Sequence, residues 1–404
     1  MFNSYLNACS RILIVVSLIV FLLVYPVSIS AQQSNAQNSR IPKEERLEAT
    51  ITKIIEEKEI EIEGLGKKQL YQQLEAKVEK GSKKNQKIIV ESGNIPAANV
   101  RKYVEGDKIV ITASKDFEGR DVYYITDYVR RTPLLLLLLI FIALTIFIGR
   151  KRGIASLFGM LLSFLIIFKF VLPQISNGSD PIVIAVVASF AIIPITFYLS
   201  HGFNKKTNSA VLGTFVALIL TGFLASYFVD AARLTGFASE EAGFLENMKQ
   251  GTVNIQGLLL AGIIIGVLGI LDDITISQAA IVQQLKRLDP NLTFYQLYSK
   301  AMDIGRDHIA SMVNTLVLVY TGAALPLLLL FINNPIPFSE VINYEMLAEE
   351  IIRTLVASIG LILAVPITTL FAASIIGIDF SEFTSSTPQK TSEKAKIKKF
   401  IIKS

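Results

Sequence analysis

Residues 257–273 read GLLLAGIIIGVLGILDD, a glycine-punctuated apolar run that ends in two adjacent acids, Asp272 and Asp273. Runs of about 18 or more mostly apolar residues are typical of membrane-spanning helices. Such runs recur along the 404 residues of the chain, of which 51% are hydrophobic. The sequence therefore predicts a polytopic α-helical membrane bundle that is solvated by the lipid bilayer.

The apolar runs predict about seven transmembrane helices in a domain at 132–378. Lys and Arg then concentrate on one side of the membrane, in short loops, in a connector at 272–308 and in a basic tail at 379–404. The positive-inside rule makes that side the cytoplasm. We therefore expect a multi-pass protein of the bacterial plasma membrane, with its amino-terminal domain outside and its carboxyl-terminal tail cytoplasmic. The expected spans are 133–149, 153–172, 181–200, 209–229, 255–271, 309–332 and 351–377.

Residues 1–31 have the composition of a secretory signal peptide, with Arg11 ahead of an apolar core, then Pro26 and small residues. An uncleaved signal anchor is the alternative, and both deliver residues 32–131 to the outside. Short alternating segments separated by glycines predict a small extracytoplasmic β domain there, as a closed or partly open barrel that resembles an OB fold. The candidate strands are 47–55, 59–64, 72–81, 87–92, 107–114 and 121–129.

Within the opening stretch, Gly262, Gly266 and Gly269 lie on nearly the same helical face. Small residues allow close helix packing in lipid, so we expect a helix contact there. Asp272 and Asp273 follow, where we expect the helix to end and its dipole to disfavour negative charge. Two such carboxylates suit a proton-coupled site or a hard cation, which takes oxygen ligands. Alternatively, both acids simply mark the water interface.

The connector predicts a surface-lying amphipathic helix that stops at Asp289-Pro290 and a second helix that begins after a capping box of Thr293 and Gln296. Asp307, Ser311 and Asn314 then share one face that leads into the sixth span. Such a polar stripe either lines a cavity or bonds to a neighbouring helix. Our candidate pathway or coupling residues are Asp272, Asp273, Gln278, Asp303, Arg306, Asp307, His308 and Asn314.

Longer words in this region resemble a known family. They are GVLGILDD at 266–273, AMDIGRDHIAS at 301–311, VNTLVL at 313–318 and YTG at 320–322. Together with the order of apolar segment, small β domain and membrane bundle, they resemble the YibE/F-like family of multi-spanning bacterial membrane proteins. The resemblance extends over nearly the whole chain after the signal segment. It implies this architecture and no settled biochemical activity.

Transport or permeation of a small solute or ion is the first functional hypothesis, and a membrane scaffold or regulator that binds a partner through its β domain is the second. An intramembrane enzyme is third, because the chain has no HExxH, no GxSxG and no phosphate-binding glycine loop followed by Lys. We therefore expect no enzyme, cofactor or catalytic metal. The single cysteine, Cys9, excludes an intramolecular disulfide. The modest basic excess is explained by topology, without nucleic acid, and the sequence names no protein partner.

Overall fold

The computed structural model describes residues 45–61, 68–94, 100–115, 120–249, 251–332 and 336–377. The expected signal segment at 1–31 and the tail at 379–404 lie outside these residues. The chain forms two compact units, and the boundary between them falls between Leu144 and Thr145. Each unit is described by itself.

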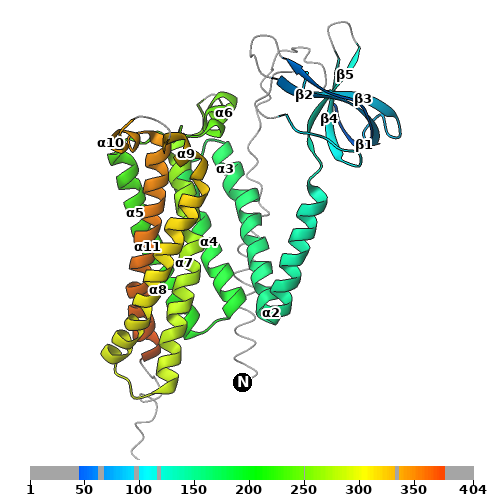
Figure 1. Ribbon diagram of the computed structural model, residues 1–404. Coiled ribbons are helices and arrows are strands. Elements are labelled where there is room, and N and C mark those ends of the chain that lie inside the picture. The colour runs from blue at the N-terminus through cyan, green and yellow to red at the C-terminus, as the bar shows by residue number, and fades with distance from the viewer. Residues whose placement is uncertain are drawn as a thin grey trace, which may run out of the picture. The chain divides into compact units, whose positions relative to one another are not determined.

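The first unit contains a closed five-stranded barrel (Figure 1). Its strand order is β1-β2-β3-β5-β4, and every neighbouring pair is antiparallel except β3 with β5. Each strand has two neighbours in the closed barrel, although beyond Ile51 β1 pairs with β2 only. The strands are β1 (Glu45–Glu61), β2 (Lys68–Lys80), β3 (Lys87–Ser92), β4 (Lys108–Lys115) and β5 (Asp121–Tyr128).

The barrel interior is filled by alternate apolar residues of its strands. Leu47, Ile51, Leu74, Ile109 and Ile111 are among the fully buried side chains. This alternation is the period expected of strands with one buried face. The sequence reading divided β1 wrongly, because residues 47–55 and the described part of 59–64 form one strand. Shifts of register in its pairing with β2 mark the irregular middle of this strand.

The helix α2 (Arg131–Ile166) is interrupted at Arg150, whose backbone lies outside the helical region at φ 51° and ψ −133°. It therefore consists of two helices joined at a kink. A π-helical turn, η1 (Ile167–Val171), and the short helix α3 (Leu172–Ser176) continue it without a gap. The segments expected as two spans, 133–149 and 153–172, therefore belong to one helical run, Arg131–Ser176, and lie on either side of its kink at Arg150.

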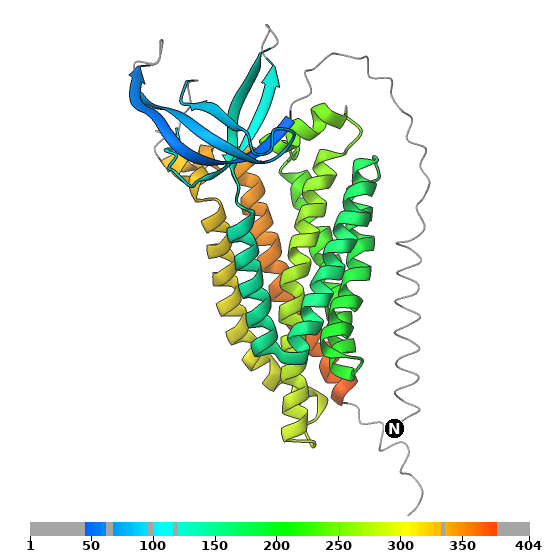
Figure 2. The same cartoon turned by 90° about the vertical axis from the view of Figure 1, so that its right-hand side faces the viewer.

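The second unit is a helical bundle (Figures 1 and 2). Five described helical runs are long and apolar enough to cross a membrane, and the pair α8 and α9, bent by 68°, makes a sixth if it counts as one span. The chain is therefore an integral membrane protein. Beyond α2, the helices are α4 (Pro181–His201), α5 (Lys205–Ala231), α6 (Glu240–Lys249), α7 (Ile255–Leu288), α8 (Phe294–Ala323), α9 (Leu325–Ile332), α10 (Phe338–Val341) and α11 (Glu345–Gly377).

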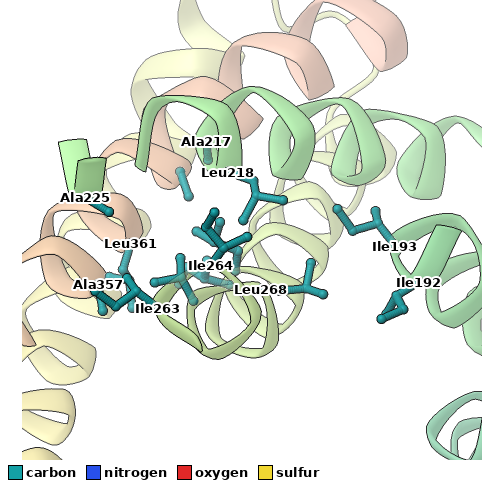
Figure 3. Close-up of a cluster of buried hydrophobic side chains, with 14 of the residues drawn as sticks. Ile192, Ile193, Ala217, Leu218, Ala225, Ile263, Ile264, Leu268, Ala357 and Leu361 are labelled. Carbon is teal, nitrogen blue, oxygen red and sulfur yellow. The ribbon is translucent and has the colours of Figure 1, made fainter. Parts of the chain in front are cut away.

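The centre of the bundle is α7, which packs against α4, α5, α8 and α11. Figure 3 shows Ile263 and Ile264 of α7 among apolar side chains of α5 and α11. In the same view Leu268 points from α7 toward Ile192 and Ile193 of α4. The helix α7 thus packs side chains against α5 and α11 on one side and directs Leu268 toward α4 on another.

The expected end of this helix at Asp272 is wrong, because α7 continues without a break to Leu288. Beyond the acid pair, Ile274, Gln278 and Val282 are buried at helical spacing, so packing sustains the helix. The segment expected as a separate surface helix is the last part of α7. The helix does end at Leu288, and the capping box of Thr293 and Gln296 that begins α8 is confirmed.

Candidate functional site: a polar groove between α2, α4 and α7

A groove of about 610 Å³ lies between the second half of α2, α4 and α7. All of its lining residues belong to the second compact unit. Each helix contributes one face to it, so the site is built by helix packing. The lining residues are Thr145, Arg152, Gly153, Ser156, Met160, Ser163, Ile167, Ile192, Ile193, Thr196, Ser200, His201, Ile265, Leu268, Gly269, Asp272, Asp273 and Ile276.

The α7 face of the groove follows from the helical period. Ile265, Leu268 and Asp272 are separated by three and four residues, as are Gly269, Asp273 and Ile276. Residues at these intervals lie on one side of an α-helix. Because α7 remains helical through the acid pair, Asp272 is held on the same face as Ile265 and Leu268.

Polarity changes along the groove. At one end, near the middle of α4 and of the first half of α7, it is lined by Ile192, Ile193 and Ile265. At the other end Arg152, at the start of the second half of α2, and His201, at the end of α4, accompany the two acids. The groove therefore has an apolar portion and a charged portion.

The hydroxyl groups in the groove are oriented by their own helices. Ser163 Oγ donates to the Gly159 carbonyl at 3.0 Å, and Thr196 Oγ1 donates to the Ile192 carbonyl at 3.0 Å. A hydroxyl has one hydrogen and two lone pairs. With the hydrogen engaged by the backbone, both side chains have only acceptor lone pairs left for other partners.

The two acids differ in their surroundings. Asp272 is half-buried, whereas Asp273 is exposed. The lining residues of the polar end carry two carboxylates, one guanidinium and one imidazole, and Lys206 lies close enough to interact with both Arg152 and His201. This arrangement is suited to attract a cation or to exchange protons with water.

Two glycines define the shape of the groove. A Cβ at Gly159 would be 3.6 Å from the Cα of Thr196, so this glycine lies where α2 approaches α4. A Cβ at Gly269 would meet no atom within 4 Å, so that position opens into the groove. The groove is thus closed at the α2–α4 contact and open beside α7.

The expected helix contact of Gly262, Gly266 and Gly269 is not made. All three are exposed, and a Cβ at any of them would meet no atom of the described residues within 4 Å. The close contacts of the bundle use other glycines, such as Gly213 against Thr368 and Gly305 against Val365. The three glycines do lie on one face of α7, as their spacing predicted, but the face that packs against other helices is the one with large apolar side chains.

A family model described as YibE/F-like protein matches residues 137–377, which is more than half of the chain. The chain belongs to the YibE/F-like family. The match includes every residue that lines the groove. It begins after the last strand of the barrel, so it does not include the β domain, to which the resemblance was expected to extend. No curated protein and no solved structure matches the chain significantly.

The remaining candidate residues of this YibE/F-like chain lie away from the groove. Gln278 is fully buried, and its amide donates to the Ala301 carbonyl at 3.0 Å and to Thr369 Oγ1 at 2.8 Å. It thereby connects α7 to α8 and α11. Asp303 and Arg306 form an exposed ion pair of 2.7 Å within α8.

The stripe of Asp307, Ser311 and Asn314 is exposed on α8. It does not line the groove between α2, α4 and α7, and no hydrogen bond reaches Asn314 from the described residues. His308 beside it is half-buried. Among the described residues, the stripe therefore neither lines this groove nor forms a hydrogen bond to a neighbouring helix.

Sequence reasoning missed most of the residues that line the groove. Arg152 belongs to the loop cations that were read as a topology signal, and His201 was not among the candidate residues. Thr196 and Ser200 are four residues apart and Ser156 and Ser163 are seven apart, and this helical spacing of hydroxyl groups in apolar runs was the available signal. Within the described residues, no group of three His, Cys, Asp or Glu side chains is arranged to hold a metal ion.

Proposed function

We propose that the helical bundle transports a small solute or ion, and that the groove between α2, α4 and α7 is part of its path. The observation that carries this proposal is a half-buried acid, Asp272, on a membrane-length helix beside an opening of about 610 Å³. Ionisable side chains inside membrane helices are costly and usually face a water-filled cavity or a substrate path.

The chemistry of the polar end favours a cation or a proton as the transported species. Asp272 and Asp273 supply carboxylate oxygens, and Ser163 and Thr196 present acceptor lone pairs farther along the groove. Hard cations bind such oxygen ligands. A carboxylate in contact with water also accepts and releases protons, so proton coupling uses the same residues.

The proposed topology has seven spans. The break at Arg150 divides α2 into two spans, and the bent pair α8 and α9 counts as one. With the positively charged loops inside, the signal segment exports the barrel, and the polar end of the groove faces the cytoplasm. The apolar portion, near Ile192 and Ile265, then separates this end from the outside.

The proposal is tested with the full-length protein in liposomes loaded with pH-sensitive and cation-sensitive dyes, against H⁺, Na⁺, K⁺, Mg²⁺ and Ca²⁺. The test variant is Asp272→Asn, which keeps the shape of the side chain. Asp289→Asn is the matched control, because Asp289 is exposed beyond the end of α7 and outside the groove.

We expect a flux of at least one cation that Asp289→Asn retains and Asp272→Asn reduces at least about tenfold, the loss that follows when about 1.4 kcal/mol of stabilisation is removed. Absence of flux for the whole panel, or an equal flux through both variants, would contradict the proposal. Melting curves of each variant show whether a loss of flux comes from misfolding.

A second candidate function is a membrane scaffold or regulator. It is favoured by the barrel, which is a separate compact unit with an OB-like strand order and exposes Ile55, Ile89 and Val104 on its surface. Co-purification of a protein that is lost when residues 45–128 are deleted, combined with absence of flux, would support this function over transport.

A further inference from the structure

Asn314 is an exposed amide in a membrane-spanning helix. It lies seven residues beyond Asp307 on α8, which places it about 10 Å farther into the bilayer. The run formed by α8 and α9 is long and apolar enough to cross the membrane. Among the described residues, nothing donates a hydrogen bond to this side chain or accepts one from it.

An amide at this depth needs a polar partner. Hydrocarbon chains neither donate nor accept hydrogen bonds, so an unpaired polar group in them is strongly unfavourable. The side chain of Asn is also too short to reach the headgroups, unlike Lys or Arg. The neighbouring Thr315 has no such need, because its hydroxyl donates to the Ser311 carbonyl at 3.0 Å.

The surface around Asn314 permits another helix to approach closely. Ala310 and Ser311 precede it by one turn on the exposed face, and both are small. Small residues let membrane helices pack with their backbones near each other, and an interhelical hydrogen bond then adds to the association. The opposite face of α8, with Leu297, Gly305 and Leu316, is already buried in the bundle.

The partner must present a hydrogen-bonding group at the same depth. Residues 134–144 of this chain cannot do so, because LLLLLLIFIAL carries no side chain that donates or accepts a hydrogen bond. A second copy, inserted in the same orientation, presents the same amide at the same depth. An amide has both donors and an acceptor, so it is complementary to itself.

We propose that the exposed face of α8 forms the contact of a two-fold symmetric dimer, in which Asn314 and the partner's Asn314 hydrogen-bond to each other. An isologous interface of this kind uses the same surface on both copies. The proposal is independent of the transported species, because the groove lies on other helices.

The charges on α8 determine how the two helices meet. Asp307 is on the same exposed face, and two parallel helices in full contact would bring two such acids together. Small-residue contacts in membranes commonly cross at about 40°, which separates the helices away from the crossing point. The crossing therefore lies near Ala310 and Asn314, with Asp307 in the aqueous region where the helices diverge.

Cysteine crosslinking in native membranes tests the interface directly. The chain has one cysteine, Cys9, so a Cys9→Ser background gives a thiol-free protein. Into it we would introduce Asn314→Cys and Ala310→Cys on the proposed face. Phe223→Cys on α5 is the matched control, because Phe223 is 73% exposed on an apolar membrane helix of the same bundle.

With a mild oxidant, we expect both α8 variants to give an adduct of twice the chain mass, and Phe223→Cys to give little. In a full-length chain with native Cys9, Asn314→Leu should raise the dimer dissociation constant in lipid about 3- to 30-fold, the range of interhelical hydrogen bonds in membranes. Equal crosslinking of all three cysteine variants, adducts only with other proteins, or an Asn314→Leu dimer as tight as the wild type would overturn the proposal.

Discussion

Gln278 on α7 and Thr369 on α11 are joined by a hydrogen bond of 2.8 Å, and both side chains are fully buried. The same amide nitrogen donates to the Ala301 carbonyl of α8 at 3.0 Å. One side chain therefore bonds to two of the helices that pack against α7. Polar contacts of this kind connect helices where the lipid offers no competing partner.

This contact predicts that Gln278→Glu is strongly destabilising. The substitution keeps the shape but replaces a double donor by oxygens that face two acceptors, and an uncompensated buried charge typically costs about 3–5 kcal/mol. The free energy of unfolding should be measured by denaturant titration in mixed micelles. Gln284→Glu, at an exposed position of the same helix, should change it by less than about 0.5 kcal/mol. Similar losses in both variants would contradict the role given to Gln278.

Gly153 should tolerate no side chain. A Cβ there would be 2.1 Å from the Thr145 carbonyl oxygen, and both residues line the groove. Gly153→Ala must therefore displace the backbone at the kink of α2, at a cost of about 1–3 kcal/mol. Gly149→Ala is the control, because a Cβ at Gly149 meets nothing within 4 Å. We expect the melting temperature to fall for Gly153→Ala only, and equal melting temperatures would show that the kink is not tightly packed.

Filling the groove should stop transport without unfolding the bundle. Gly269→Phe places a ring in the opening, because nothing lies within 4 Å of a Cβ at that position. Gly262→Phe adds the same ring to the same exposed face of α7, outside the groove. The liposome flux should fall at least about tenfold in the first variant, which corresponds to about 1.4 kcal/mol, and persist in the second. Full flux through Gly269→Phe would place the path elsewhere.

The barrel should lose stability in acid. Arg130 and Arg101 hold the pKa of the Asp127 carboxyl well below its usual range, and Ser82 lowers the pKa of Glu45. A group whose folded pKa is lowered stabilises the fold above its unfolded pKa, and this stabilisation is lost as the pH falls toward the folded value. Hydrogen-exchange protection factors of the full-length protein, taken relative to the intrinsic exchange rate at each pH, should therefore fall in residues 45–128 as the pH falls below about 4.

The control for this acid effect is Asp127→Asn, which removes the titrating group. Its hydrogen-exchange protection at neutral pH should be lower than that of the wild type, and it should depend less on pH in the acid range. A barrel whose protection is the same from pH 7 to pH 2 in both proteins would show that these ion pairs do not contribute to its stability. The side chains of Asp127, Arg101 and Arg130 are 41–50% exposed, so screening by solvent makes the expected effect small.

The sequence predicted the class of fold well because that class depends on simple periodicities. Apolar runs identified the spanning helices, and alternation identified a small β barrel. The predicted end of α7 was wrong, because the two adjacent acids were given more weight than the apolar pattern that follows them. Ile274, Gln278 and Val282 continue the buried face of the helix, and that continuity could have been read from the sequence.

Only a small part of the groove could be predicted from the sequence, for a related reason. Asp272 and Asp273 are conspicuous in an apolar run, whereas Ser163 and Thr196 are ordinary residues of membrane helices. Their importance comes from the way α2, α4 and α7 are placed side by side, which no local pattern encodes. The face toward which a glycine stripe points is likewise decided by the other helices, as Gly266 illustrates.

The unbroken course of α7 has a mechanical consequence. Its 34 residues span about 51 Å, well beyond the roughly 30 Å of a bilayer core. The same helix carries Asp272 beside the groove and Lys286 near its end. The ammonium group of Lys286 donates hydrogen bonds to the carbonyls of Pro290 and Leu292 in the turn that follows. If an occupant of the groove tilted α7, the unbroken helix would also move the turn that leads into α8, because Lys286 is bonded to that turn.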